Sequence, residues 1–289
     1  MKKLIYLLIT VFNPVLSNSV YSNLLFRVNS IRLKRPYYKL DIDHPKTFTE
    51  KINYIKFNIR NDFSAVVADK FEVRQFVAKR AGEQVLIPLL KVYDRPEEID
   101  LSRFDEDIIL KMTNGSGGNL MVRKGHEIRN EYAIKFFKKN FKKNIYLFSR
   151  EWHYKNVKPR ILAEKLLSDN LNDYKFFCTK EGPFAVQVDV DRFTNHKRNL
   201  YDLDWNLLPY KIRYENSDCA VPKPENLNRM IEVSKKLCTD FMFSRIDLYD
   251  FEDTVYFGEI TLHPGGGGEP FDSKASDLAF GKYVDLNFK

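Results

Sequence analysis

Cysteine is scarce in this chain of 289 residues. The three cysteines, Cys178, Cys219 and Cys238, are far apart in the sequence and odd in number. This spacing excludes a disulfide framework and a CxxC-type metal site, and it favours a reducing compartment. Glycine and proline number only 12 each, which excludes collagen-like and linker-like chains.

The N-terminal hydrophobic run is short. Residues 4–12 are apolar between Lys2-Lys3 and Asn13-Pro14, which is too short to span a bilayer. The run resembles the core of a signal peptide, but no convincing small-x-small cleavage site follows it. Residues 32–39 are basic and contain two tyrosines. Two interpretations of this N-terminal arm stay open: a peripheral membrane contact, or a helix that packs on the body.

The remaining composition is that of a folded, mildly basic protein. Hydrophobic residues make up 44% and aromatic residues 14%, which excludes a disordered chain. Lys and Arg exceed Asp and Glu by 47 to 39, giving a net charge of +8. Such a balance fits nucleic acid, an anionic membrane surface or a polyanionic substrate. The sequence has no zinc finger, RNA-binding aromatic motif or basic leucine zipper, so we expect no nucleic-acid partner.

Helix and strand patterns alternate from residue 45 to the end, which is an α/β pattern. Thr47 and Glu50 form a capping-box pattern at the start of the first of these helices. Further helices are predicted from residue 69 to Gly82, over 127–141 and over 225–240. The predicted strands are 85–93, 108–112, 120–122, 161–167, 173–179, 184–190, 242–249 and 254–262. Pro88 indicates that the first of these strands lies at a sheet edge or contains a bulge.

Lys111 stands at the entrance of a glycine-rich loop, residues 113–118, between two predicted strands. Glycine-rich backbone can direct successive N–H groups at an anion, and a nearby ammonium adds positive charge. The loop lacks the GxxxxGK[ST] spacing of a P-loop. Phosphate binding and a plain flexible hairpin both fit this pattern, and the loop alone favours the plain hairpin.

The last predicted hairpin carries charged residues at alternating positions. Alternate residues of a strand share a face. Arg245 and Asp247 therefore lie on one face of the first strand, and Glu259 and Thr261 lie on one face of the second. A three-residue turn at 251–253 would place Arg245 opposite Glu259 and both acids on one side. A four-residue turn would place the acids on opposite sides. The two interpretations are a Mg²⁺ site built on both carboxylates, or an Arg245–Glu259 ion pair with Asp247 solvated.

A third candidate is the apolar segment 161–167, followed by Asp173. An apolar strand edge could offer backbone groups to a purine, and Asp173 could accept hydrogen bonds from ribose. The alternative is an ordinary amphipathic strand and turn.

The order of these three pieces resembles the ATP-grasp fold. This resemblance implies an α+β fold with two subdomains that clasp ATP and a reduced N-terminal region. More narrowly, the chain resembles the teichuronopeptide-biosynthesis type of ATP-grasp family, found among bacterial capsule and cell-surface polysaccharide genes. The resemblance runs from about residue 45 to the end. It is carried by PKTFTEK (45–51), ADKFEVR (68–74), LK (110–111) with NGSG (114–117), AEKLL (163–167), DYKFFC (173–178), RIDLY (245–249) and YFGEIT (256–261).

The resemblance implies a nucleotide site for ATP. Lys111 is similar to the lysine that reaches the α- and β-phosphates, and Lys70 to an earlier lysine of the fold. The resemblance implies a mobile lid loop at Asn114, Gly115, Ser116, Gly117 and Gly118. The implied adenine hinge is Glu164, Lys165, Leu166 and Leu167, and the ribose-binding residues are Asp173, with Lys175 beside it.

The resemblance also implies a Mg²⁺ site and a catalytic arginine. Asp247 and Glu259 are similar to the metal ligands, and Arg245 to the arginine that stabilises the transferring phosphoryl group and the tetrahedral intermediate. Thr261 stands where the family's ligases usually carry a third ligand, asparagine. Asn114 stands where the family loop often carries histidine. These departures concern the number of bound Mg²⁺ ions rather than the activity.

On this resemblance we expect a carboxylate–amine ligase that forms an acyl phosphate from ATP. Its partners would be a carboxylate-bearing glycan or uronic acid and an amine or amino acid. We expect it in the cytoplasm, at or near the inner face of the membrane. The implied organisation is an arm over 1–44, an N-terminal α/β subdomain over 45–105, a lid subdomain over 106–167 and a C-terminal subdomain over 168–289.

Two other classes of protein stay open. One is a glycosyltransferase or a kinase, and residues 189–191 form a DxD triplet that would suit a glycosyltransferase. The other is a non-catalytic nucleotide- or glycan-binding module.

Several other features have two interpretations each. Residues 265–268 are four glycines that would suit either a tight turn or close approach to a substrate carboxylate. His263 could touch substrate, His153 is expected to be packed or at the surface, and His196 is expected in a solvated loop. A solvated helix face or a polyanion-binding surface is expected at Lys138, Lys139, Lys142, Lys143 and Lys155.

Overall fold

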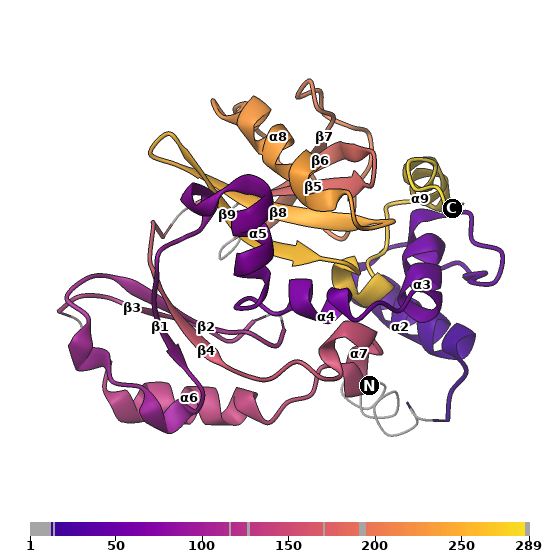
Figure 1. Ribbon diagram of the computed structural model, residues 1–289. Helices are drawn as coiled ribbons and strands as arrows, with labels where there is room; N and C mark the ends of the chain where they lie inside the picture. The colour runs from indigo at the N-terminus through magenta and orange to yellow at the C-terminus, as the bar shows by residue number, and fades with distance from the viewer. Residues whose placement is uncertain are drawn as a thin grey trace.

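The computed structural model describes residues 13, 15–115, 117–125, 128–169, 171–190 and 195–286. The apolar run at 4–12, Ser116 of the glycine-rich loop and Asp191 of the DxD triplet lie outside these residues. Two antiparallel β-sheets and the helices packed on them make up the described part (Figure 1). Within it, no helix is both long and apolar enough to cross a membrane.

The four-stranded sheet has the order β1 (Leu89–Tyr93), β4 (Ile161–Lys165), β2 (Ile108–Met112), β3 (Asn119–Val122). The five-stranded sheet has the order β7 (Lys197–Tyr201), β6 (Gly182–Val190), β5 (Asp173–Thr179), β8 (Ser244–Phe251), β9 (Thr254–Thr261). The helices are α2 (Asn18–Leu33), α3 (Phe48–Asn58), α4 (Phe63–Ala68), α5 (Val73–Ala81), α6 (Asn130–Phe141), α7 (Tyr146–Ser149), α8 (Leu227–Cys238) and α9 (Lys274–Gly281).

The four-stranded sheet has one apolar face and one mixed face, because successive side chains of each strand point to opposite faces. In β2, Ile108 and Leu110 are buried against Phe137 of α6, which lies along that side of the sheet (Figure 1). The intervening Ile109 and Lys111 point to the opposite face, where a cleft opens. This alternation fixes Lys111 on the cleft side.

The five-stranded sheet is covered on one face by α5 and α8 (Figure 1). Its apolar side chains there pack with those of α8, for example Ile246 against Leu237. The opposite face has two parts. At one end Phe177 packs with Phe48 of α3 and Phe280 of α9. The remainder of that face carries charged side chains.

The N-terminal helices begin at side-chain caps. Ser17 accepts a hydrogen bond from the Val20 N–H at 3.2 Å at the start of α2. The predicted capping box of α3 is confirmed: Thr47 accepts from the Glu50 N–H at 3.2 Å, and Glu50 accepts from the Thr47 N–H at 2.9 Å. Residues 18–33, within the predicted arm, therefore form a helix, whose Tyr21 packs edge-on against Phe57 of α3.

The predicted loop around His196 continues into a strand. His196 lies outside any helix or strand, but Lys197–Tyr201 forms the edge strand β7. Within this strand Arg198 is buried, because its guanidinium is paired with Asp189 of β6, with an Nε–Oδ1 distance of 2.7 Å. An ion pair between two strands is not visible in the hydrophobic pattern of either strand's sequence.

A buried carboxyl joins α9 to α3 and predicts a pH effect. Asp277 accepts a hydrogen bond from the Thr49 N–H at 2.9 Å and one from the Tyr38 hydroxyl. Burial raises the pKa of Asp277 to about 6, from an ordinary 3.8. The native state therefore binds more protons than the unfolded chain between about pH 4 and 6. Stability should fall as the pH rises through this window.

We expect Asp277→Asn to remove this pH dependence. The free energy of unfolding of the variant, relative to wild type, should rise by about 2 kcal/mol between pH 4 and 7. Urea denaturation at a series of pH values measures it. Asp43→Asn, at an exposed position nearby, is the control. Parallel stability curves for wild type and Asp277→Asn would contradict the prediction.

Candidate active site

A row of charged side chains crosses the open face of the five-stranded sheet. The strand register places Lys175 of β5 opposite Asp247 of β8, and Asp247 opposite Glu259 of β9. In the next row, Asp173 of β5 lies opposite Asp189 of β6. Residues directly opposite one another share a face, so the register alone brings these groups together.

The β8–β9 hairpin reaches this register by an unexpected route. Its turn has two residues, Glu252 and Asp253, both with positive φ, and not the expected three. A bulge then adds one residue to β9, because Asp247 pairs with Glu259 and Leu248 pairs with Phe257. The expectation that both acids share one side is confirmed.

The predicted position of Arg245 within the hairpin is wrong. Arg245 lies opposite Thr261 and not opposite Glu259, because the shorter turn and the bulge shift the pairing. Gly258 is the extra residue of the bulge. A Cβ there would lie 3.0 Å from the Tyr249 ring and 3.1 Å from the Asp247 carbonyl oxygen, which explains why glycine occupies it.

Asp247 is the centre of the charged row. Arg245 binds it with two hydrogen bonds, from Nε at 2.7 Å and from Nη2 at 2.8 Å, and Lys175 Nζ lies 2.8 Å from Oδ2. Burial alone would lower the pKa of Arg245, but Asp247 raises it above its usual range. Asp247 is only 2% exposed, so the alternative in which it is solvated is wrong.

Glu259 is the accessible carboxylate of the row. Its side chain is 32% exposed, and Lys70 Nζ lies 3.3 Å and Arg245 Nη2 3.6 Å from its oxygens. Thr261 donates a hydrogen bond to Oε1 at 3.3 Å. Burial would raise the pKa of Glu259, but Lys70 and Arg245 lower it to about 2. The group is therefore ionised at neutral pH and reachable by a ligand.

The oxygen atoms at this point suit Mg²⁺. Two carboxylates, Asp247 and Glu259, and the Thr261 hydroxyl supply oxygen ligands, which Mg²⁺ prefers. Glu259 has the exposed surface that a metal needs, while Asp247 is satisfied by its two cations. Of the predicted metal ligands, the structure thus brings all three together on one face.

Lys70 connects the charged row to the glycine-rich loop. Its Nζ donates to the Gly115 carbonyl oxygen at 2.8 Å while it faces Glu259. The loop joins β2 to β3, as predicted, and Asn114 donates to the Lys143 carbonyl at 3.4 Å. Positive φ angles are found at Gly115, Gly117 and Gly118. Glycine adopts positive φ angles without strain, whereas other residues do not. Such a backbone suits a loop that adapts its N–H groups to a ligand.

Lys111 and Glu164 face each other across β2 and β4. Lys111 Nζ lies 2.9 Å from one Glu164 oxygen, and Arg74 Nη1 of α5 lies 2.8 Å from the other. Arg74 also donates to the Ile87 carbonyl at 2.8 Å. Glu164 is therefore balanced by two cations, of which only Lys111 belongs to the predicted set.

A cleft of about 570 Å³ separates the two sheets. It is lined by Lys111, Asp173 and residues 165–167 of the predicted site, together with Asp189 and Tyr249. Glu164 and the Asp247–Glu259 pair do not line this cleft; they lie beside it. Asp173, held by Lys175 at 3.0 Å, connects the cleft to the charged row.

The prediction of an exposed strand edge at 161–167 is wrong, because β4 lies between β1 and β2. The N–H groups of Lys165 and Leu166 already donate to the carbonyls of Pro88 (3.1 Å) and Asp107 (2.9 Å). What faces the cleft is the segment after the strand, including Leu166 and Leu167.

Two charged residues of the site, Arg74 and Asp189, were not predicted as site residues from the sequence, although Asp189 belongs to the DxD triplet. Asp189 lies between His196 Nε2, at 3.1 Å, and Arg198. Burial would raise the pKa of Asp189, but His196 and Arg198 lower it. The sequence signals for Asp189 were the DxD triplet and the alternation of polar residues along β6.

The glycine run at 265–268 packs against the N-terminal helices α2 and α3. Asn53 of α3 donates to the Gly267 carbonyl at 2.6 Å, and Asn29 of α2 donates to the Gly268 carbonyl at 2.8 Å. A Cβ on Gly267 would lie 2.8 Å from the Asn53 side chain. The tight-turn interpretation therefore accounts for these glycines.

The sequence profile of one protein family, described as TupA-like ATPgrasp, matches residues 50–285. The chain belongs to the TupA-like ATP-grasp family. The ATP-grasp fold expected from the sequence is thereby confirmed, and the two-sheet arrangement around the cleft is its form here.

Several solved structures resemble this chain. D-alanine–D-alanine ligase from Helicobacter pylori is 16% identical, with 84% of this chain and 68% of that chain covered and a TM-score of 0.46. N5-carboxyaminoimidazole synthetase from Staphylococcus aureus is 13% identical, with 69% and 45% covered and a TM-score of 0.42. The ATP-grasp ligase PsnB, complexed with minimal precursor, Mg and ADP, is 12% identical, with 70% and 52% covered and a TM-score of 0.39.

The chain thus spans 68% of the first of these enzymes and about half of the other two. No curated protein matches it significantly.

Proposed function

We propose that this protein is an ATP- and Mg²⁺-dependent carboxylate–amine ligase. The observation that carries the proposal is the position of the cleft. It opens between the two sheets, directly beside the row of Lys175, Asp247 and Glu259. A nucleotide in the cleft would direct its phosphates toward that row, where cations and oxygen ligands for Mg²⁺ are already assembled.

The cleft residues suit the parts of ATP. Leu166 and Leu167 supply an apolar wall for adenine, and Asp173 supplies an acceptor for the ribose hydroxyls. Lys111 can turn from Glu164 to a phosphate at modest cost, because Arg74 continues to balance the Glu164 charge. Lys70 and the glycine-rich loop would contact the triphosphate from the other side.

Charge balance explains why the site would need a metal ion. Three cations, Lys70, Lys175 and Arg245, already face three carboxylates, Asp173, Asp247 and Glu259. The row is therefore close to neutral and cannot by itself compensate a triphosphate. Mg²⁺ bound by Asp247, Glu259 and Thr261 would supply the missing positive charge at the reacting phosphate.

The reaction would proceed in two displacements. The substrate carboxylate attacks the γ-phosphorus, and ADP leaves, giving an acyl phosphate. The amine then attacks the carbonyl carbon, phosphate leaves, and the amine loses one proton. Arg245, whose Nη2 contacts both Thr261 and Glu259, is placed to stabilise negative charge on the transferring group. Closure of the glycine-rich loop would keep water from the acyl phosphate.

The substrate assignment belongs to the same proposal. We propose a carboxylate-bearing glycan or uronic acid and an amine or amino acid, in the assembly of a bacterial capsule or surface polysaccharide. Two features support it: the family relationship, and the exposed lysines along and after α6, which offer positive charge to a polyanion. Cytoplasmic location, with contact of the N-terminal arm at the inner membrane face, completes the proposal.

The ligand dependence of thermal stability tests the nucleotide part. ATP or ADP with Mg²⁺, at 100 times its dissociation constant, should add about 2.7 kcal/mol to the free energy of unfolding. UDP-sugars should have no effect. Stabilisation by UDP-sugars alone would overturn the ligase and favour a glycosyltransferase. ADP release in a screen of uronic acids paired with amines then tests the reaction.

A further inference from the structure

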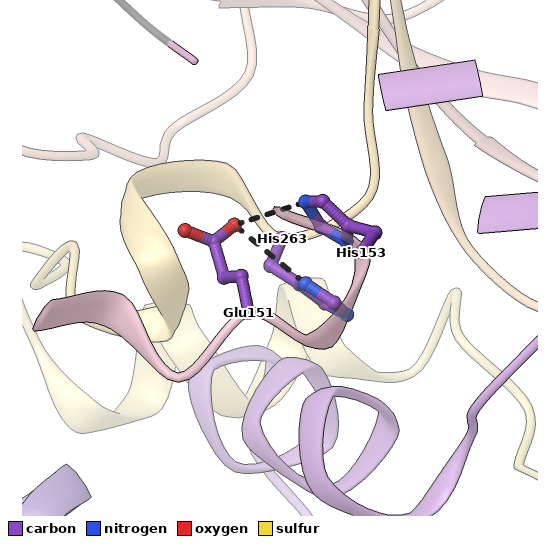
Figure 2. A group of neighbouring side chains, drawn as sticks. All are labelled: Glu151, His153 and His263. Carbon is purple, nitrogen blue, oxygen red and sulfur yellow. Dashed lines mark ion pairs between the residues drawn. The ribbon is translucent and has the colours of Figure 1, made fainter. Parts of the chain in front are cut away.

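A second group of ligating side chains lies outside the nucleotide site. Glu151 and His153 lie at the short helix η4 (Trp152–Tyr154), in the segment that leads into β4. His263 follows the last residues of β9. Figure 2 shows the three side chains meeting between their two segments. Their exposed fractions are only 8%, 3% and 5%.

Both histidines direct a ring nitrogen at the same carboxylate oxygen (Figure 2). Nε2 of His153 lies 3.7 Å and Nδ1 of His263 lies 3.6 Å from Oε1 of Glu151. These separations are too long for hydrogen bonds. They are close to the roughly 3.4 Å that separates two ligand atoms of a tetrahedral zinc ion with bonds near 2.0–2.1 Å. The three ligand atoms all lie within 4.8 Å of one another.

One of these nitrogens is left without a hydrogen bond. Nδ1 of His263 is buried and has no hydrogen-bond partner, although it points at Glu151. A buried polar atom in that condition is destabilising unless a ligand satisfies it. Coordination of a metal ion between His263 and Glu151 would satisfy this nitrogen.

The side-chain types suit metal binding as well. A divalent transition-metal ion is bound by neutral imidazole and ionised carboxylate groups, which are the two kinds of side chain found here. The Lys56 ammonium donates to the Gly266 carbonyl at 2.6 Å.

We propose that Glu151, His153 and His263 bind one divalent transition-metal ion, with Zn²⁺ as the ion tested first. Two imidazole nitrogens and one carboxylate oxygen favour Zn²⁺ over Mg²⁺, which prefers oxygen ligands. A cavity of about 120 Å³ is lined by both histidines, Trp152 and Leu262. It adjoins both histidines and offers room for water as a fourth ligand.

The ion would have a structural role. It would cross-link the segment entering the four-stranded sheet to the end of the hairpin that carries Glu259 and Thr261. This metal site is separate from the proposed Mg²⁺ site in ligands and in donor chemistry. Its test measures metal binding alone, so it does not depend on the ligase proposal.

The test is titration of chelator-treated full-length protein with ZnCl₂ against a chromophoric competitor. Wild type should bind one Zn²⁺ per chain at this site and melt at a higher temperature with the ion. Glu151→Gln and His263→Gln should weaken binding by more than the roughly 10–100-fold that loss of an outer-shell partner costs. His44→Gln, at an exposed histidine, is the matched control and should bind as wild type does. Co²⁺ added to wild type should give the visible absorption of a tetrahedral nitrogen and oxygen site.

Three results would overturn the proposal. One is the absence of saturable Zn²⁺ binding, or of the Co²⁺ band, in wild type. Another is equal affinity in wild type and in the Glu151→Gln/His263→Gln double variant. The third is loss of binding in Asp247→Asn while Glu151→Gln retains it, which would place the ion at the carboxylates of β8 and β9.

Discussion

Replacing Asp247 by asparagine is expected to lower the rate of ADP release by roughly 100-fold or more and to destabilise the fold. Asparagine keeps the shape of the side chain but removes the charge between Arg245 and Lys175. Removing one member of a buried ion-pair group costs about 3–5 kcal/mol. We expect the lower end, about 3 kcal/mol, because Lys175 retains Asp173 and Arg245 retains Glu259.

Two measurements separate the structural and chemical parts of this prediction. Chemical denaturation gives the change in stability, and ADP release at a temperature where the variant is folded gives the change in rate. Asp253→Asn, in the exposed turn of the same hairpin, is the matched control, because asparagine tolerates its positive φ. Folded Asp247→Asn with the wild-type rate would show that the reacting phosphate lies elsewhere.

Lys111→Met and Glu164→Gln should change different properties, although the two side chains contact each other. We expect the first to weaken ATP binding and the second to destabilise the fold. Loss of Lys111 leaves Glu164 paired with Arg74, so the fold should be nearly unchanged. A charged hydrogen bond to phosphate would be lost, and the ATP dissociation constant should rise roughly 10–100-fold. Glu164→Gln instead leaves two cations facing a neutral amide and should destabilise the fold by about 3 kcal/mol.

Calorimetric titration with ATP and Mg²⁺ measures the first effect, and urea denaturation the second. Lys91→Met, at an exposed position of the same sheet, controls for the loss of one positive charge. If Lys111→Met destabilised the protein as much as Glu164→Gln, Lys111 would be a structural residue. If both variants bound ATP as wild type does, the cleft would not be the nucleotide site.

The parts of the fold that were predicted correctly depend on local sequence. The strand at 108–112 has the predicted bounds, because it is a short, mostly apolar run that ends at the glycine-rich loop. The capping box of α3 was also predicted, since Thr47 and Glu50 interact within a single turn. Alternation correctly grouped Arg245 with Asp247 along β8 and Glu259 with Thr261 along β9, whereas the turn and the bulge decided that both acids share one side.

What was missed depends on pairing between distant segments. No local pattern indicates that β4 is an inner strand, because its partners come from residues more than 45 positions earlier in the chain. Arg198 looks solvated in sequence and is buried only because Asp189 meets it from the adjacent strand. Arg74 joins the site across 90 residues to reach Glu164. The metal-ligating group was missed for the same reason, since Glu151 and His263 are brought together only by the tertiary fold.

Because of the bulge at Gly258, the number of residues between Asp247 and Glu259 decides whether the two carboxylates share a face of the sheet. Without the extra residue, the two-residue turn would pair Asp247 with position 258, and Glu259 would face the apolar side packed against α8. A single insertion or deletion between Asp247 and Glu259 therefore exchanges the two faces of β9 unless a second such change restores the count. The hairpin can lengthen or shorten at its tip only in steps of two. The number of residues in this hairpin is thus constrained as well as their chemistry, even at exposed positions that touch no substrate.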